Sequence, residues 1–219
     1  DSGGALSVDY MDFGRIAQYS IGPGGIPVSN GTYSPFSLNF YAGYGLKVTQ
    51  GLAAGATAKF LYQSLVPGGS SATAAVDAGI LYRLPWLPGA SLALVLANLG
   101  GELDSTSLPL QLKAAAAYQF SMEPDAEAVP RHSFNFAADG DITMVDPGFT
   151  NFRMGAEYWY HRLIAARVGY RFAPYGNLDG LTGLSLGAGV RYQKWELAYG
   201  LTTQGDMGTT HQISLAYRF

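Results

Sequence analysis

The chain alternates apolar residues with polar or small ones over long stretches. In residues 36–49 apolar side chains occupy every second position, while Ser, Asn, Gly, Lys and Thr occupy most of the positions between them. A period of two is typical of a β-strand with one apolar face. The stretch is longer than a usual soluble strand and long enough for a tilted strand that crosses a membrane, which needs about 9–11 residues. Its apolar positions are Phe36, Leu38, Phe40, Ala42, Tyr44, Leu46 and Val48.

The same alternation recurs to the end of the chain. It predicts an all-β fold, an antiparallel transmembrane up-and-down β-barrel of about 12 strands, and a single domain over residues 1–219. The further strands are expected at 52–62, 74–82, 110–120, 152–160, 164–172, 184–192, 195–201 and 213–219, with weaker ones at 6–10, 92–96 and 134–138.

The links between these strands fall into two classes, as expected for a barrel with short periplasmic turns and longer outer loops. Links 49–51, 161–163 and 193–194 are tight and lie at one end, although the longer link 121–132 lies there too. The long outer loops, rich in Gly, Pro, Asp and Ser, are expected at 14–35, 63–71, 98–109, 140–151, 173–182 and 203–210.

Composition supports a membrane environment. Apolar residues make up 48% of the chain and charged residues only 13%, about half the usual share of a soluble protein. No apolar run is long enough for a transmembrane helix, and the N-terminus has no signal-peptide layout. The absence of cysteine excludes disulfides and thiolate metal sites, and a formal charge of −3 argues against nucleic acid as a partner.

Aromatic and apolar positions predict where the barrel meets lipid. Aromatic residues gather near the strand ends, where amphipathic rings favour the headgroup level. The side chains expected to face lipid are Phe36, Leu38, Phe40, Leu46, Phe152, Met154, Leu184, Leu186, Ile213 and Leu215.

Several segments resemble known outer-membrane proteins. Residues 211–219 resemble the C-terminal signal that the barrel-assembly machinery reads, with Tyr217 and the final Phe219 as its aromatic positions. The stretches 42–49, 78–83, and 96–100 followed by 108–110, look like the PorV/PorQ family, which is itself similar to the FadL fatty-acid transporters. The family pattern has 14 strands and an N-terminal plugging segment. Neither the extra strands nor that segment is visible, so we expect a truncated or processed member, or a related 12-strand barrel.

The resemblance implies a location in the bacterial outer membrane and a scaffold or shuttle role in type 9 secretion, with secretion-apparatus proteins or cargo as partners. A FadL-like transporter of hydrophobic small molecules and a simple diffusion channel remain alternatives, because a fold does not fix a function. Outer-membrane lipid and the assembly machinery are the other expected partners, and no cofactor is expected.

No catalytic pattern is convincing, so we expect no enzyme. Residues 183–187 match the G-x-S-x-G pattern, but Ser185 lies in an alternating strand rather than at the sharp strand-to-helix turn that a nucleophile elbow needs. Three histidines, His132, His161 and His211, are too few and too scattered for a metal cluster. Asp139, Asp141 and Asp146 could offer oxygens to calcium, but a solvated acidic loop explains them better.

Charges on the inward parity predict a polar lumen with a basic excess. A tight turn at 193–194 should place Arg191 opposite Glu196, and a hairpin turning at Met207 would place Arg218 opposite Glu196 as well. A turn at 161–163 should likewise pair Glu157 with Arg167, and it leaves Arg153 facing Arg171 as like charges. We therefore expect an open lumen to prefer anions. The inward set is Lys47, Lys59, Arg83, Lys113, Arg153, Arg167, Arg171, Arg191 and Arg218 against Asp9, Asp77, Asp139, Glu157 and Glu196.

Overall fold

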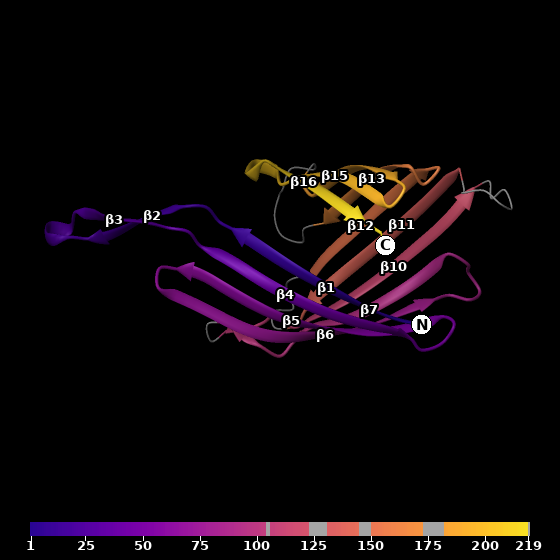
Figure 1. Ribbon diagram of the computed structural model, residues 1–219, viewed down its shortest axis with the longest axis horizontal. Helices are drawn as coiled ribbons and strands as arrows, with labels where there is room; N and C mark the ends of the chain where they lie inside the picture. Colours follow the sequence, from indigo (N-terminus) through magenta and orange to yellow (C-terminus); the bar gives the residue numbers. More distant parts are fainter. Residues whose placement is uncertain (104–105, 123–130, 145–149, 173–181, 219) are drawn as a thin grey trace. The chain divides into compact units, whose positions relative to one another are not determined.

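The computed structural model describes residues 1–103, 106–122, 131–144, 150–172 and 182–218, which are almost entirely β-strand (Figure 1). In these ranges no helix has the length and apolarity needed to cross a membrane. The strands are β1 (Ser2–Asp12), β2 (Ile16–Ile21), β3 (Pro27–Tyr33), β4 (Phe36–Lys47), β5 (Leu52–Val66), β6 (Gly69–Arg83), β7 (Ala90–Leu99), β8 (Glu102–Leu103), β9 (Thr106–Ser107), β10 (Gln111–Met122), β11 (His132–Thr143), β12 (Thr150–Tyr160), β13 (Ile164–Phe172), β14 (Leu184–Tyr192), β15 (Trp195–Thr203) and β16 (Thr209–Tyr217). Two 3₁₀ turns complete the fold, η1 (Pro23–Gly25) and η2 (Gly205–Met207).

Twelve strands form one sheet in the order β1-β4-β5-β6-β7-β10-β11-β12-β13-β14-β15-β16. Nearly every neighbour in this order follows directly along the chain, which is the up-and-down arrangement predicted from the alternation. The hairpins β2–β3 and β8–β9 stand outside this sheet. A pairing of β1 with β16, which would close a barrel, is not among the pairs that the described residues form.

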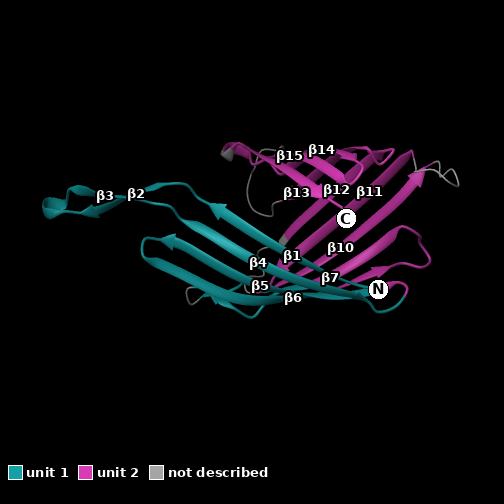
Figure 2. Ribbon diagram, in the orientation of Figure 1, with its two compact units in different colours: residues 1–49, 53–79, 96–110 teal, residues 50–52, 80–95, 111–219 magenta. Residues whose placement is uncertain are grey.

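The chain divides into two compact units, coloured separately in Figure 2. The first comprises residues 1–49, 53–79 and 96–110, and the second comprises residues 50–52, 80–95 and 111–219.

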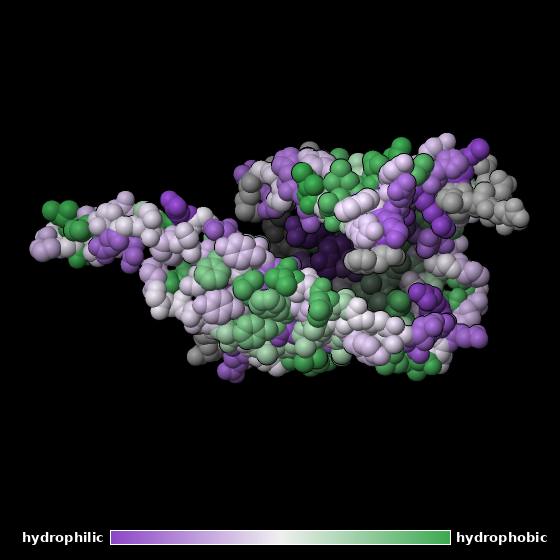
Figure 3. Space-filling model, in the orientation of Figure 1, coloured by the Kyte–Doolittle hydropathy of each residue, from purple (hydrophilic) through white to green (hydrophobic). Residues whose placement is uncertain are grey.

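In the first unit, β1, β4 and β5 pair in an unbroken antiparallel register. Hydrophobic side chains gather on the exposed face of these strands (Figure 3). Leu6, Phe40 and Phe60 on this face are 86%, 44% and 46% exposed. Because side chains alternate between faces, the opposite face carries polar groups. There Lys59 binds Asp77 at 2.7 Å, and both contact Asn98.

In the second unit, tight turns set the register of successive strands as the sequence predicts. Tyr160 pairs with Ile164 across a three-residue turn, and Tyr192 pairs with Trp195 across a two-residue turn. His161, Arg162 and Gln193 in these turns have φ values of 47°, 55° and 54°. A left-handed backbone there matches the twist of the strands on either side.

Several loops are shorter than predicted, because the strands extend beyond the residues whose apolar–polar alternation predicted them. Strand β11 continues to Thr143 and β12 starts at Thr150, so half of the expected loop 140–151 is strand. The expected loops 14–35 and 98–109 each contain a hairpin, and the loop 203–210 is reduced to η2 and its flanking residues. The expected loop 173–182 falls almost wholly outside the described residues, and so does most of the link 121–132.

Candidate functional site

The polar face of the second unit carries the candidate site. Its strands lie in register, so side chains of one parity form rows that run across the sheet. One charged row contains Asn135, Glu157 and Arg167, and another contains Asp139, Arg153 and Arg171.

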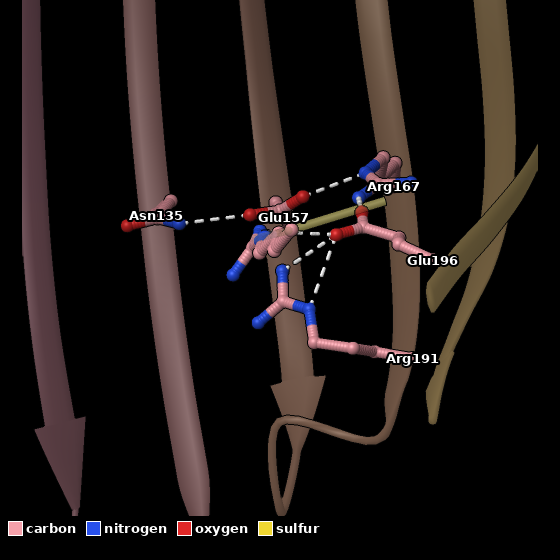
Figure 4. Close-up of polar contacts among 6 residues, drawn as sticks. Asn135, Glu157, Arg167, Arg191 and Glu196 are labelled. Carbon is pink, nitrogen blue, oxygen red and sulfur yellow. Dashed lines mark hydrogen bonds and ion pairs between the residues drawn. The ribbon is translucent and has the colours of Figure 1, made fainter. Parts of the chain in front are cut away.

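The row nearer the 161–163 and 193–194 turns forms a continuous ion-pair network (Figure 4). Glu157 accepts hydrogen bonds from Arg167 Nε at 2.6 Å and from Asn135 Nδ2 at 2.8 Å. Glu196 accepts from Arg191 Nη2 at 2.7 Å and from Arg167 Nη2 at 3.2 Å. Arg167 therefore bridges the two carboxylates, and five strands are tied together through their side chains.

Arg218 joins this network from a position different from the predicted one. The hairpin of β15 and β16 places Ala216, not Arg218, opposite Glu196, because the turn is centred one residue earlier than Met207. Arg218 nevertheless reaches Glu196 Oε2 diagonally, at 3.2 Å. The Arg218 side chain is long enough to reach Glu196 although the register is shifted by two residues.

The sequence interpretation missed Trp159, which lies under the same network. Its ring is 6% exposed, with Arg191 Cζ 4.2 Å and Arg167 Cζ 5.4 Å from its centroid. Such stacking of cations on an aromatic face is favourable when solvent is displaced. Trp159 shares the inward parity of Glu157, so the alternation itself could have identified it.

The second charged row corrects the interpretation of the acidic residues near residue 140. Asp139 and Asp141 lie in strand β11 rather than in a loop, and Arg153 binds both, at 2.6 Å and 2.8 Å. Asn151 donates a further hydrogen bond to Asp141, whose side chain is 5% exposed. These carboxylates neutralise a guanidinium. Asp146 lies outside the described residues, within which no group of His, Cys, Asp and Glu could hold a metal ion.

Arg171 stands next to this paired group. It lies directly opposite Arg153, as the sequence predicts, and it is exposed. On the other flank Lys113 lies opposite Asp141. In the described part of the chain, no carboxylate lies within ion-pair distance of Arg171 or Lys113.

The opposite face of the second unit is apolar. Met154, Val168 and Leu186 are 45%, 47% and 50% exposed. An open groove of about 640 Å³ lies on this face, with Phe136 and Met154 among its lining residues.

Aromatic rings lie at both ends of this apolar face. At one end Phe172 contacts both Phe152 and Tyr170. At the turn end the contacting rings are Tyr118, Phe120, Phe134, Phe136, Tyr158, Tyr160 and His132.

The remaining candidate residues lie in ordinary strand positions. Ser185 lies near the start of β14, paired with Thr202, whose hydroxyl it bonds at 3.0 Å. The backbone there is an extended strand rather than a nucleophile elbow. Tyr217 packs against Trp195 at the end of β16 with the rings tilted, whereas Phe219 lies outside the described residues.

Neither a family model nor a curated protein matches this chain. Among solved structures, engineered variants of the porin of Rhodopseudomonas blastica align with 98% of this chain and 100% of their own. The identity is 10% and the TM-score is 0.37 for two of them. A structure titled for the asymmetric conductivity of engineered proteins aligns over the same shares, at 9% identity and a TM-score of 0.33.

Proposed function

We propose that the protein is an outer-membrane β-barrel, closed by pairing of β1 with β16, that forms a diffusion channel preferring anions. The observation that carries this proposal is the division of the strands into two unlike faces. One face holds paired charges, and the other is exposed and apolar with aromatic rings at both ends. Such strands suit a wall between lipid and a polar lumen.

The charge balance of the polar face favours anions. Strands β10 to β16, together with Arg218 of the ion-pair network, place six basic and four acidic described side chains on this face. A basic excess inside a low-dielectric wall raises the local concentration of anions. The basic members are Lys113, Arg153, Arg167, Arg171, Arg191 and Arg218, and the acidic ones are Asp139, Asp141, Glu157 and Glu196.

Recordings from the purified protein in planar lipid bilayers test this function. Under a KCl gradient we expect discrete current steps and a reversal potential on the anion-selective side of zero. A cation preference would contradict the selectivity. An absence of steps would contradict the channel itself and would favour a barrel filled by side chains.

A second candidate is a partner-binding scaffold, the role that the PorV resemblance implies. The hairpin β2–β3 favours it, because Tyr19, Ile21 and Ile26 are 64%, 85% and 66% exposed outside the main sheet. Binding residues often lie on loops that a rigid scaffold holds in place. Deletion of residues 16–33 should abolish capture of secretion-apparatus proteins from membranes while leaving channel current unchanged. Capture that survives the deletion would reject this role.

A transporter of hydrophobic molecules has less support. Such a molecule would need an apolar site on the lumen side, whereas the groove of the second unit lies on the apolar face that we assign to lipid. A catalytic role has no arrangement of residues to support it in the part of the chain that the structure describes, and we propose none.

A further inference from the structure

The hairpin of β2 and β3 contains the one Asn-Gly pair of the chain, Asn30 followed by Gly31. The hairpin stands outside the main sheet, and both residues are exposed. A glycine at the second position matters because it has no Cβ to shield its own backbone nitrogen. The other asparagines in the described part of the chain are followed by Phe or Leu, and they are Asn39, Asn98, Asn135 and Asn151.

The pairing of β2 with β3 is interrupted at this dipeptide. Asn30 and Gly31 together lie opposite the single residue Gln18, with paired residues on either side. Two residues against one form a β-bulge, which locally disrupts the hydrogen-bond ladder. Gly31 has a φ of 96°, and apart from its chain neighbours no heavy atom lies within 4 Å of the position a Cβ would take. The backbone nitrogen of Gly31 is therefore less enclosed than one in a regular strand.

The side chain of Asn30 is held by the opposite strand. Ser20 Oγ donates a hydrogen bond to Asn30 Oδ1 at 3.2 Å. When a nucleophile attacks the amide carbon Cγ, negative charge develops on Oδ1, and a donor already aimed at that oxygen stabilises the charge. Ser20 thus favours attack on the Asn30 amide.

We propose that Asn30 is a site of spontaneous deamidation, that Ser20 raises its rate, and that the product gives the hairpin a negative charge. The Gly31 nitrogen loses its proton to water and attacks Asn30 Cγ. A succinimide ring forms, the bond from Cγ to Nδ2 breaks, and ammonia leaves with a proton from water. A second water molecule then opens either carbonyl-to-nitrogen bond of the ring and leaves aspartate or isoaspartate. The net change consumes one water and releases one ammonia, with no oxidation or reduction.

The new charge changes the character of the hairpin. Residues 16–33 carry no charged side chain, and Ile21, Ile26 and Val28 among them are 85%, 66% and 47% exposed. A carboxylate at residue 30 is thus the first charge on an otherwise neutral and partly apolar surface. Burying that charge against a partner would be costly, so deamidation weakens any apolar contact that the hairpin makes there. This inference is independent of the proposed channel.

Peptide mapping by mass spectrometry tests the site in the full chain. The detergent-solubilised protein is incubated at mildly alkaline pH, and trypsin then releases residues 16–47 as one peptide that contains both Asn30 and Asn39. We expect the amide-to-carboxylate mass change at Asn30 to appear at least about tenfold faster than at Asn39, because only Asn30 has an unshielded nitrogen and a donor at Oδ1. Equal rates at the two asparagines would overturn the site.

Two serine variants test the part played by Ser20. Ser20→Ala removes the donor to Asn30 Oδ1 and should slow the reaction about fivefold, the effect of one hydrogen bond on a barrier. Ser29→Ala makes the same change in the same hairpin, at the residue before Asn30, and should leave the rate unchanged. Both serines are exposed, and both variants keep the Asn-Gly pair. The same rate in Ser20→Ala as in wild type would show that Ser20 does not assist the reaction.

Discussion

At the scale of single residues, Glu196 combines several charged partners with partial burial. Its carboxylate meets Arg191, Arg167 and Arg218 at 2.7, 3.2 and 3.2 Å, and its side chain is 15% exposed. A partly buried carboxylate with several guanidinium partners contributes more than an exposed pair, because removing it leaves charges without partners.

We expect Glu196→Gln to lower the free energy of unfolding by about 1–3 kcal/mol, because three cations then share a neutral amide. Urea titration of the protein in lipid vesicles would measure the change. Glu102→Gln, at an exposed position in β8, should have almost no effect. A Glu196 variant as stable as wild type would show that the network contributes nothing to stability.

The apolar face leads to a second prediction at this scale. Leu186 lies near the middle of the apolar face and is 50% exposed, so in a membrane its side chain would meet hydrocarbon. Leu186→Arg should destabilise the protein in vesicles by about 2–4 kcal/mol. Ser214→Arg, on the polar parity of β16, should change stability little. Equal effects of the two variants would contradict the assignment of the faces.

At the scale of elements, Asn98 controls the end of β7. Its φ of 63° interrupts the regular strand, and its side chain accepts from Lys59 and donates to the Pro109 carbonyl. The backbone N–H of Asn98 binds Asp77 at 2.8 Å. Asparagine tolerates this left-handed conformation better than most residues, so one residue both bends the strand and anchors the β8–β9 hairpin.

We expect Asn98→Ala to cost about 2 kcal/mol, through the strained φ and the lost hydrogen bonds. It should also speed proteolysis within residues 99–109, because the hairpin loses its anchor. Asn30→Ala, whose only described side-chain contact is with Ser20, is the matched control. Unchanged proteolysis would show that the hairpin is held by other contacts.

At the scale of the whole molecule, the proposed barrel requires pairing of β1 with β16. Both strands are exposed along their full length, and open strand edges invite association with other chains. An even number of alternating strands would make the two edges antiparallel, which allows closure.

Because the chain has no cysteine, engineered disulfides can test closure directly. We expect Ser7→Cys combined with Gln212→Cys or Ser214→Cys to form an intramolecular disulfide in membranes, since these positions share the polar parity. Ser7→Cys with Ser29→Cys should form none. Only intermolecular crosslinks in the first pairs would contradict a closed barrel within one chain.

The sequence by itself determined which residues share a face, because a strand must alternate and the pattern is unbroken over most strands. It also determined local registers such as Glu157 opposite Arg167 and Arg191 opposite Glu196, because turns of two or three residues leave one pairing possible. Contacts across longer links depended on the tertiary structure. Arg218 reaches Glu196 diagonally because η2 shifts the register, and its long side chain tolerates that shift.

The neutralisation of Arg153 also depended on the tertiary structure. Asp141 binds Arg153 because strand β11 extends beyond the residues that the alternation predicted as strand. Periodicity within a strand assigns a residue to a face, but the register between strands decides which neighbours it meets.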